Sequence, residues 1–258
     1  MNHRFTAMTF NLRVDVEVDG KNFWPRRVKS VLTIIHKHRP DFLATQEVTD
    51  RMLQDLELPL NCYQAYGDGR NADRHGERCT LFVRKDHWKI DHSETVWLSA
   101  TPTIPGSMDP EEGFPRICTM VVASSLLDES KLLVANVHLS YRSARSLDQN
   151  ITTLLAYLSE WRVKYPYPVI LLGDFNANPS HPIHERIKGI GLLSPLDSRS
   201  GAIKNTFHDF LGGKGIETID YIYYTPDLSL FSYYVDQSKI GERYPSDHFP
   251  VVADFIVK

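Results

Sequence analysis

The sequence has little cysteine and lacks both a long apolar segment and an excess of basic charge. Its three cysteines, Cys62, Cys79 and Cys118, lie far apart without a C-x-x-C pair, which argues against a disulfide framework and against a zinc knuckle. We expect all three to be reduced and buried. No apolar run approaches the roughly 20 residues of a membrane span. The N-terminus enters a strand-like segment without an apolar signal region, so we expect a cytoplasmic protein without a membrane span.

The charged residues give no general attraction for polyanions, because 29 Lys and Arg against 32 Asp and Glu leave a formal charge of -3. A nucleic-acid partner therefore needs a local basic patch, for which the candidates are Arg70, Arg74, Arg78, Arg84 and Lys85. The chain shows no repeat, no low-complexity linker and no break in composition. We therefore predict one domain over residues 1–258 and expect a monomer.

Apolar periodicity predicts many strands and few helices. Residues 143–164 carry the clearest apolar stripe at helical spacing. The predicted helices are 24–38, 50–58, 143–164 and 183–190, and the predicted strands are 5–12, 41–47, 79–84, 89–97, 116–124, 131–138, 169–172, 218–224, 231–235 and 251–257. This order indicates an α/β protein with sheets packed face to face and covered by helices. Residues 99–115, rich in proline, predict a long loop at the rim of a binding site.

The segment 169–178 is the most informative part of the chain. Its apolar start predicts a strand buried on both faces, and Gly173 then opens the backbone before Asp174 and Asn176. These two side chains point the same way if the chain stays extended. A carboxylate and a carboxamide together suit a divalent cation, or a water and phosphate beside one. The alternative is an Asx turn, since Asp, Asn and Pro are common turn residues.

Polar residues of catalytic type recur at the ends of predicted strands. Each alone is more often a cap or turn residue, but the chain places six such groups: Asn11, Glu47, Asn136 with His138, Asp174 with Asn176, Asp220, and Asp247 with His248. Asn136 and His138 share one strand face, and Asp220 is a candidate carboxylate to orient His248. The alternative for His138 is an imidazole satisfied by a backbone carbonyl at a strand edge.

These groups belong to motifs that follow one another along the chain: Thr9-Phe10-Asn11, Gln46-Glu47, Asn136-Val137-His138-Leu139, Gly173-Asp174-Phe175-Asn176, Ile219-Asp220-Tyr221-Ile222 and Ser246-Asp247-His248-Phe249-Pro250. Their order resembles that of the endonuclease/exonuclease/phosphatase (DNase I-like) superfamily, which includes DNases, abasic-site endonucleases, sphingomyelinases, inositol phosphatases and the nocturnin branch. Residues 22–27, 97–99, 105–107 and 114–116 look like the compact bacterial members. Those members usually place Trp before Asp in the long loop, where this chain has Asp109-Pro110-Glu111-Glu112-Gly113.

The resemblance implies a four-layer α/β/β/α sandwich of two mainly antiparallel sheets flanked by helices, with the site at one end between the sheets. It also implies a divalent cation, Mg²⁺ or Mn²⁺, held by Glu47 with Asn11 beside it. Asp247 either completes the surroundings of the cation or positions the neighbouring residue. A site of carboxylates, amides and imidazoles without a thiolate cluster suits these hard cations better than zinc.

The remaining roles concern water and phosphate. By resemblance, Asp174 aligns or deprotonates the attacking water, Asn176 holds water and phosphate, and His248, paired with Asp220, contacts the phosphate and takes part in proton transfer. Whether Asp174 or His248 is the base stays open. Glu77 and His138 match a second acid–imidazole pair of the DNase branch.

The substrate contacts that we expect are Asn136, Arg116 and Arg145. Guanidinium groups bind phosphate bidentately, although surface arginines equally often pair with nearby acids.

The sequence therefore predicts a Mg²⁺- or Mn²⁺-dependent enzyme that hydrolyses phosphodiester bonds, in nucleic acid by the leading interpretation. The first alternative is a phosphatase or phosphodiesterase for a small phosphoester such as a sugar or inositol phosphate, a nucleotide or a lipid headgroup. The second is a binding protein on the same fold with an inactive site, since fold does not determine function. The motifs leave open the substrate, endo or exo polarity, and the number of metals.

Overall fold

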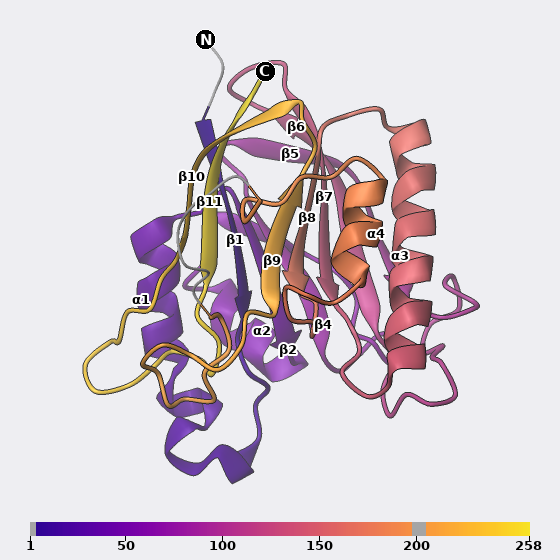
Figure 1. The fold of residues 1–258 in the computed structure, drawn as a ribbon. Coiled ribbons are helices and arrows are strands. Elements are labelled where there is room, and N and C mark those ends of the chain that lie inside the picture. Colours follow the sequence, from indigo (N-terminus) through magenta and orange to yellow (C-terminus); the bar gives the residue numbers. More distant parts are fainter. Residues whose placement is uncertain (1–3, 198–204) are drawn as a thin grey trace.

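The computed structural model describes residues 4–197 and 205–258, whose strands form two sheets (Figure 1). In spatial order, the six-stranded sheet holds β10 (Leu228–Val235), β11 (Val251–Val257), β1 (Arg4–Asn11), β2 (Phe42–Val48), β4 (Arg78–Arg84) and β3 (Tyr63–Tyr66). The five-stranded sheet holds β5 (Trp88–Trp97), β6 (Ile117–Ser125), β7 (Lys131–His138), β8 (Val169–Asp174) and β9 (Asp220–Tyr224).

Each sheet is antiparallel except for one parallel pair, β1 with β2 and β7 with β8. A parallel pair needs a crossover connection, because the chain has to return to the starting edge of the sheet. The helices α1 (Val28–His38) and α3 (Ala144–Lys164) make these two crossovers. The other helical segments are α2 (Asp50–Glu57), α4 (Ile183–Gly189) and the short 3₁₀ helices η1 (Glu17–Asn22) and η2 (Trp24–Arg26).

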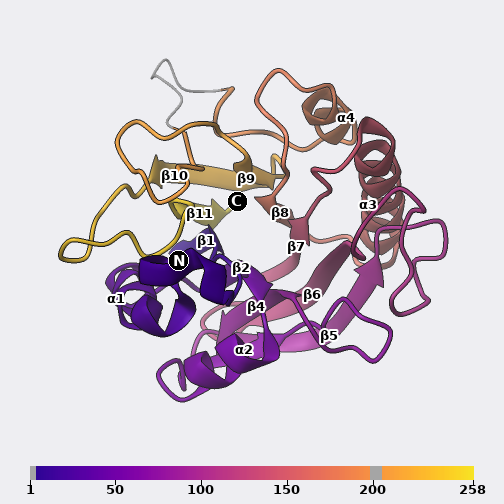
Figure 2. The same ribbon diagram turned by 90° about the horizontal axis from the view of Figure 1, so that it is seen from below.

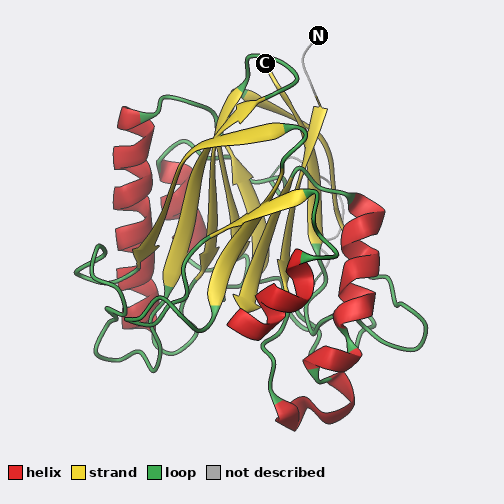
Figure 3. Ribbon diagram, turned by 180° about the vertical axis from the view of Figure 1, so that it is seen from behind, coloured by secondary structure: helices red, strands yellow, loops and turns green. Residues whose placement is uncertain are grey.

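The layers are held together by three large apolar cores. Along β7, Leu132 and Val134 face the core between the two sheets, whereas Leu133 and Ala135 face the core beneath α3. The third core lies between α1, α2 and the six-stranded sheet. Helices therefore cover both outer faces of the sheet pair, as Figures 2 and 3 show. The predicted α/β/β/α sandwich of two mainly antiparallel sheets is confirmed.

Three local predictions need correction. Helix α1 begins at Val28 and not at Trp24, because residues 24–26 form a separate 3₁₀ turn that contains Pro25. Strand β3 was not predicted; it is a four-residue edge strand, too short to show a clear period. Cys79 and Cys118 are free and buried, but Cys62 is exposed. No helix in residues 4–197 and 205–258 has the length and apolarity of a membrane-spanning segment.

The two parallel pairs bring the polar strand ends to one edge of the molecule. Strands β1, β2, β7 and β8 finish at this edge, and the antiparallel neighbours β4, β6, β9 and β11 begin there. The edge lies at the bottom of Figure 1, away from both chain termini, and faces the viewer in Figure 2. The topology thus gathers loops from both sheets in one place.

Gly173 allows β8 to approach β7 closely at this edge. Its φ is +148°, and a Cβ at this position would lie 2.0 Å from the backbone oxygen of Val137. We expect Gly173→Ala to lower the free energy of unfolding by about 3 kcal/mol or more, because the backbone contact cannot relax without breaking the parallel ladder. Urea denaturation measures the change. Gly189→Ala is the matched control, since nothing lies within 4 Å of the added Cβ; equal stability of the two variants would contradict this account.

Candidate active site

The segment after β8 turns sharply, so that Asp174 and Asn176 are held by the backbone. The Asn176 backbone N donates to Asp174 Oδ1 at 3.0 Å, which forms an Asx turn, and the Asn176 amide donates to the Leu139 oxygen at 3.0 Å. Asn176 has a φ of +48°. Such strain in a non-glycine residue is commonly found at functional sites. The Asx turn is therefore present, and Asp174 and Asn176 both still line the cleft.

Asp174 is buried among polar side chains from four strand ends. Its Oδ2 accepts a hydrogen bond from Asn11 Nδ2 at 3.0 Å, and His138 Nε2 lies 3.6 Å and His248 Nε2 3.9 Å from the same oxygen. Burial, helped by the nearby charge of Asp220, raises the pKa of Asp174. A carboxylate with a raised pKa is a better proton acceptor than an ordinary aspartate.

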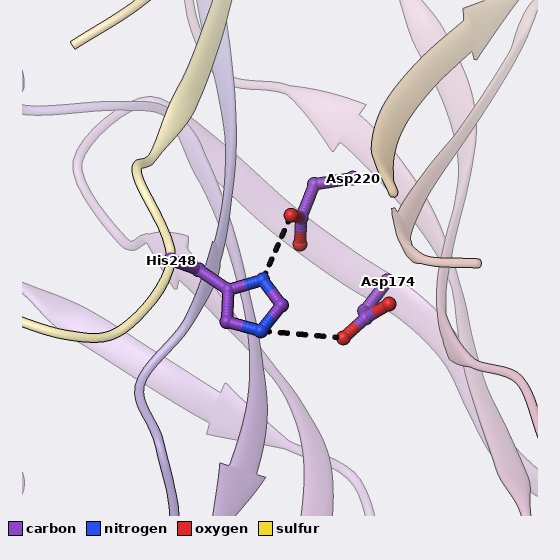
Figure 4. A group of neighbouring side chains, drawn as sticks. All are labelled: Asp174, Asp220 and His248. Carbon is purple, nitrogen blue, oxygen red and sulfur yellow. Dashed lines mark hydrogen bonds and ion pairs between the residues drawn. The ribbon is translucent and has the colours of Figure 1, made fainter. Parts of the chain in front are cut away.

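His248 lies between Asp220 and Asp174 (Figure 4). Its Nδ1 donates to Asp220 Oδ2 at 2.8 Å. Burial opposes the charged imidazolium, but the carboxylates of Asp220, Asp247 and Asp174 raise the pKa of His248 to about 10. These carboxylates favour the imidazolium form, and Nε2 lies 3.9 Å from Asp174 Oδ2. The predicted pairing of Asp220 with His248 is therefore present in the structure.

Glu47 reaches the site because of a bulge near the end of β2. The pairing of β2 with β4 shifts between Thr45 and Val48, and Glu47 has a φ of +62°. Bulges commonly redirect a side chain beside an active site. Glu47 Oε1 accepts from Asn11 Nδ2 at 3.0 Å, and Oε2 accepts from the Val14 backbone N at 2.7 Å. The bulge thus brings Glu47 beside Asn11.

Asp247 approaches Glu47 from the loop before β11. It is buried and accepts a hydrogen bond from Ser246 Oγ at 3.1 Å, while Arg13 Nε lies 3.8 Å from its Oδ2. Burial raises the pKa of Asp247, and the negative charge of Glu47 raises it further. Two carboxylates that repel each other across a site form the hard-oxygen pair that Mg²⁺ or Mn²⁺ prefers. Asn11 lies beside them, with its amide nitrogen toward Glu47 and its Oδ1 accepting from the Arg13 backbone N. The predicted residues Glu47, Asn11 and Asp247 therefore fit such a cation.

A second group also has the dimensions of a metal site. Asp174, Asp220 and His248 each offer one atom within 4.8 Å of the others, and Asp220 Oδ1 is buried without a hydrogen-bond partner in the described chain. A histidine that binds a metal does so as the neutral imidazole. The bond from Nδ1 to Asp220 fixes the ring and leaves Nε2 on the side of Asp174. The nearby carboxylates raise the pKa of His248 when no cation is bound.

Two further arginines, Arg70 and Arg116, line the same cleft. The guanidinium of Arg70 bonds both carboxylate oxygens of Glu77, with Nη2–Oε1 at 2.6 Å and Nη1–Oε2 at 2.9 Å. Within the described residues, Glu77 forms no ion pair with His138, so the expected Glu77–His138 pair is not formed. Burial, together with the positive charges of Arg116 and nearby groups, holds the pKa of His138 well below its usual range. His138 is therefore neutral, and its nearest acid is Asp174.

The three expected substrate contacts lie in different places. Arg116 lines the cleft. Asn136 is fully buried between the sheets, where its amide donates to the oxygens of Thr45 and Thr80 and accepts from Gln46. Because it has no access to a ligand, its role is to join the two sheets, and we correct that prediction. Arg145, with 65% of its side chain exposed, pairs with Glu111 outside the cleft.

A cleft of about 640 Å³ joins these groups. It is lined by Glu47, Asp247, Asp174, Asn176, His138 and His248, by Arg13, Arg70, Glu77 and Arg116, and by the rings of Phe114, Tyr141 and Phe207. Sequence reasoning missed Arg13, Phe114, Tyr141 and Phe207 as site residues, because loop residues have no period to reveal their direction. A larger hollow of about 860 Å³ lies at the other edge of the molecule, where β7 and β8 begin and β11 ends. None of the strand-end motifs lines it.

Comparison with solved structures supports the fold. The chain superposes on an endonuclease/exonuclease/phosphatase from Bacteroides vulgatus with a TM-score of 0.92 and 27% identity, covering 99% of this chain and 100% of that one. It superposes on a mannosyl-6-phosphatase from Bacteroides thetaiotaomicron with a TM-score of 0.90 and 26% identity, covering 97% and 99% of the two chains.

Comparison with curated proteins finds a second group of relatives. Nocturnin from Drosophila melanogaster is 32% identical in an alignment that is 290 residues long with its gaps and covers 90% of this chain. The match spans only 42% of the Drosophila protein. The defining pattern of the Endonuclease/Exonuclease/phosphatase family matches residues 8–248, from the first strand to the histidine of the cleft. With that match over nearly its whole length and the fold and strand-end residues described above, the chain belongs to the endonuclease/exonuclease/phosphatase family.

Proposed function

We propose that this chain is a divalent-metal-dependent phosphoesterase whose substrate is a small phosphorylated molecule. The observation that carries the choice of substrate is the state of the candidate basic patch. All four of its arginines are paired with acids: Arg70 with Glu77, Arg74 with Asp68, Arg78 with Asp50 and Arg84 with Asp86. Paired guanidiniums offer little net charge to a polyanion, whose binding depends on releasing counterions from many phosphates.

The position of the patch supports the same choice. Arg78 and Arg84 stand at opposite ends of β4, so only the first lies at the edge that carries the cleft. The formal charge of -3 supplies no compensating attraction. The similarity to the Bacteroides mannosyl-6-phosphatase, over 97% of this chain, supports a substrate of this size.

The chemistry that we propose divides the cleft between an acidic and a basic side. Glu47, Asn11 and Asp247 would hold Mg²⁺ or Mn²⁺, which when bound supplies charge neutralisation for a phosphate oxygen. Asn176 orients the attacking water and the phosphate. His248, charged and held by Asp220, donates a hydrogen bond to a non-bridging oxygen.

Asp174 is the proton acceptor in this proposal. An imidazolium has no lone pair to accept a proton, so the charged state of His248 leaves the base role to the neighbouring carboxylate. The raised pKa of Asp174 supports that role. His138, neutral and 3.6 Å from Asp174, keeps that carboxylate in place.

A second candidate is cleavage at the end of a nucleic acid. The exposed rings of Phe114 and Tyr141 line the cleft and could stack on a base. The similarity to nocturnin, at 32% identity, also supports this second candidate. This candidate needs few phosphate contacts and is therefore compatible with a paired basic patch.

An assay on four substrates separates these functions. With Mn²⁺ present, we expect turnover of p-nitrophenyl phosphate and little cleavage of bis-p-nitrophenyl phosphate or of labelled single- and double-stranded oligonucleotides. The KM for the monoester should change little with salt, whereas binding through many phosphates falls by about 10³-fold between roughly 50 and 200 mM salt. Efficient, salt-sensitive cleavage of the oligonucleotides would replace the small-molecule proposal by the nuclease.

A further inference from the structure

The guanidinium of Arg116 is buried, yet its only ion-pair partner among the described residues is Glu112, 3.6 Å away. Its side chain is 3% exposed and lines the cleft. Its Nε is buried without a hydrogen-bond partner among residues 4–197 and 205–258. Buried guanidinium groups normally satisfy several of their five donors. The unused donors of Arg116 therefore point to a missing anionic partner in the cleft.

One carboxylate lies behind this guanidinium. Glu112 Oε2 stands 3.6 Å from Arg116 Nε, close enough for an ion pair and too far for a hydrogen bond. This oxygen is also buried without a hydrogen-bond partner among the described residues. On the exposed side, the ring of Tyr141 lies 5.2 Å from the guanidinium carbon. Arg116 is thus held between a buried acid and an aromatic ring.

Glu112 itself is fixed from the other side. Its Oε1 accepts a hydrogen bond from the buried Ser140 hydroxyl, and its backbone N donates to the Asp109 oxygen at 2.9 Å. Asp109 in turn accepts from Ser146 in the first turn of α3 at 3.3 Å. The long loop is therefore tied to the helix where it carries Glu112, and the carboxylate cannot follow the guanidinium outward.

We propose that Glu112 is a positioning residue that orients the Arg116 guanidinium toward a terminal phosphate group of the substrate. The inference rests on the proposed function, and it adds a residue from the long loop to the phosphate-binding side of the cleft. A fixed carboxylate behind Nε leaves the outer edge of the guanidinium for two parallel hydrogen bonds to phosphate oxygens. A terminal phosphate suits this edge because it carries more free oxygens than a phosphodiester.

The test measures binding of inorganic phosphate by calorimetry at a fixed excess of Mg²⁺, together with KM and kcat on p-nitrophenyl phosphate. In Glu112→Gln, the new amide keeps the bond from Ser140 but turns a donor toward Nε, so the guanidinium is displaced. We expect the phosphate Kd and the KM to rise about tenfold, while kcat changes less than about threefold. This pattern is expected when the bound substrate and the transition state lose the same binding energy. Ser140→Ala should act in the same direction and serves if the first variant folds poorly.

Two controls separate positioning from a general effect. Glu111→Gln makes the same change one residue earlier on an exposed acid that pairs with Arg145, and should leave both constants unaltered. In an Arg116→Gln background, Glu112→Gln should have no further effect, because a residue that acts through another is silent once the other is absent.

Several outcomes would overturn the inference. Tighter phosphate binding by Glu112→Gln would mean that the acid only repels the anion, and an equal loss in the Arg116→Gln background would mean a purely structural role. Failure of the parental protein to bind phosphate would also overturn it. Phosphate binding with the expected changes but no turnover of any phosphoester would sink the proposed function and leave the positioning role standing.

Discussion

Asp174→Asn lowers kcat by about 10³-fold, the range expected when a group that accepts a proton in the transition state is removed. The substitution keeps the shape of the side chain, and its Oδ1 can still accept the bond from the Asn176 backbone N. At the second oxygen, the bond from Asn11 and the ion pair with His248 are lost. The measurement is steady-state turnover of the best monoester substrate at saturating metal.

The same variant should not lose thermal stability in metal-free buffer. Burial raises the pKa of Asp174, so above that pKa its charge disfavours the folded state, and the neutral amide removes this cost. We therefore expect a Tm equal to or above that of the parent, a common result when a strained functional residue is replaced. Asp148→Asn, on an exposed acid of α3, is the control and should change neither turnover nor Tm. Near-parental turnover in Asp174→Asn would remove this residue from the mechanism.

Chelation of divalent cations abolishes activity, and Mg²⁺ or Mn²⁺ restores it. Glu47, Asp174 and Asp247 all line the cleft, and the pKa values of Asp174 and Asp247 are raised by burial and by their acidic neighbours. A divalent cation relieves this repulsion and binds only the folded protein. At a free cation concentration 100 times the dissociation constant, binding raises the free energy of unfolding by about 2.7 kcal/mol. Thermal unfolding with Mg²⁺ and with EDTA measures this effect independently of catalysis.

Variants show which acids hold the cation. We expect the Mg²⁺-dependent shift in Tm to disappear in Glu47→Gln and to persist in Asp220→Asn, because Asp220 is engaged with His248. The opposite result would place the cation in the Asp174–Asp220–His248 group. Activity that survives EDTA and dialysis would rule out a metal-dependent reaction altogether.

Much of the fold could be predicted because its signals are local. The apolar stripe of residues 143–164 corresponds to α3, and Ser143 caps that helix by accepting from the Ser146 backbone N. The short run 169–172 corresponds to β8, which is buried throughout. Such patterns persist in the structure because burying one face of a helix or both faces of a strand dominates the local energy.

The strand-end residues of the candidate site could also be found from the sequence. Asn11, Glu47, Asp174 and His248 sit in short motifs whose order along the chain resembles one family, and that membership is shown by the match over residues 8–248. What the motifs did not contain was the direction in which Glu47 leaves β2. The bulge and its positive φ decide that direction.

By itself, the sequence determined most of the elements, the family and the set of polar residues at the strand ends, since periodic runs and short motifs depend on neighbours within a few positions. Only the tertiary structure decided their partners: Glu77 bonds Arg70 and not His138, Asn136 lies between the sheets, and Arg116 faces Glu112. The physical reason is that a charged or amide side chain takes whichever partner compensates its burial best. That competition is settled between residues brought together by sheet pairing and loop packing, for which the sequence carries no periodic signal.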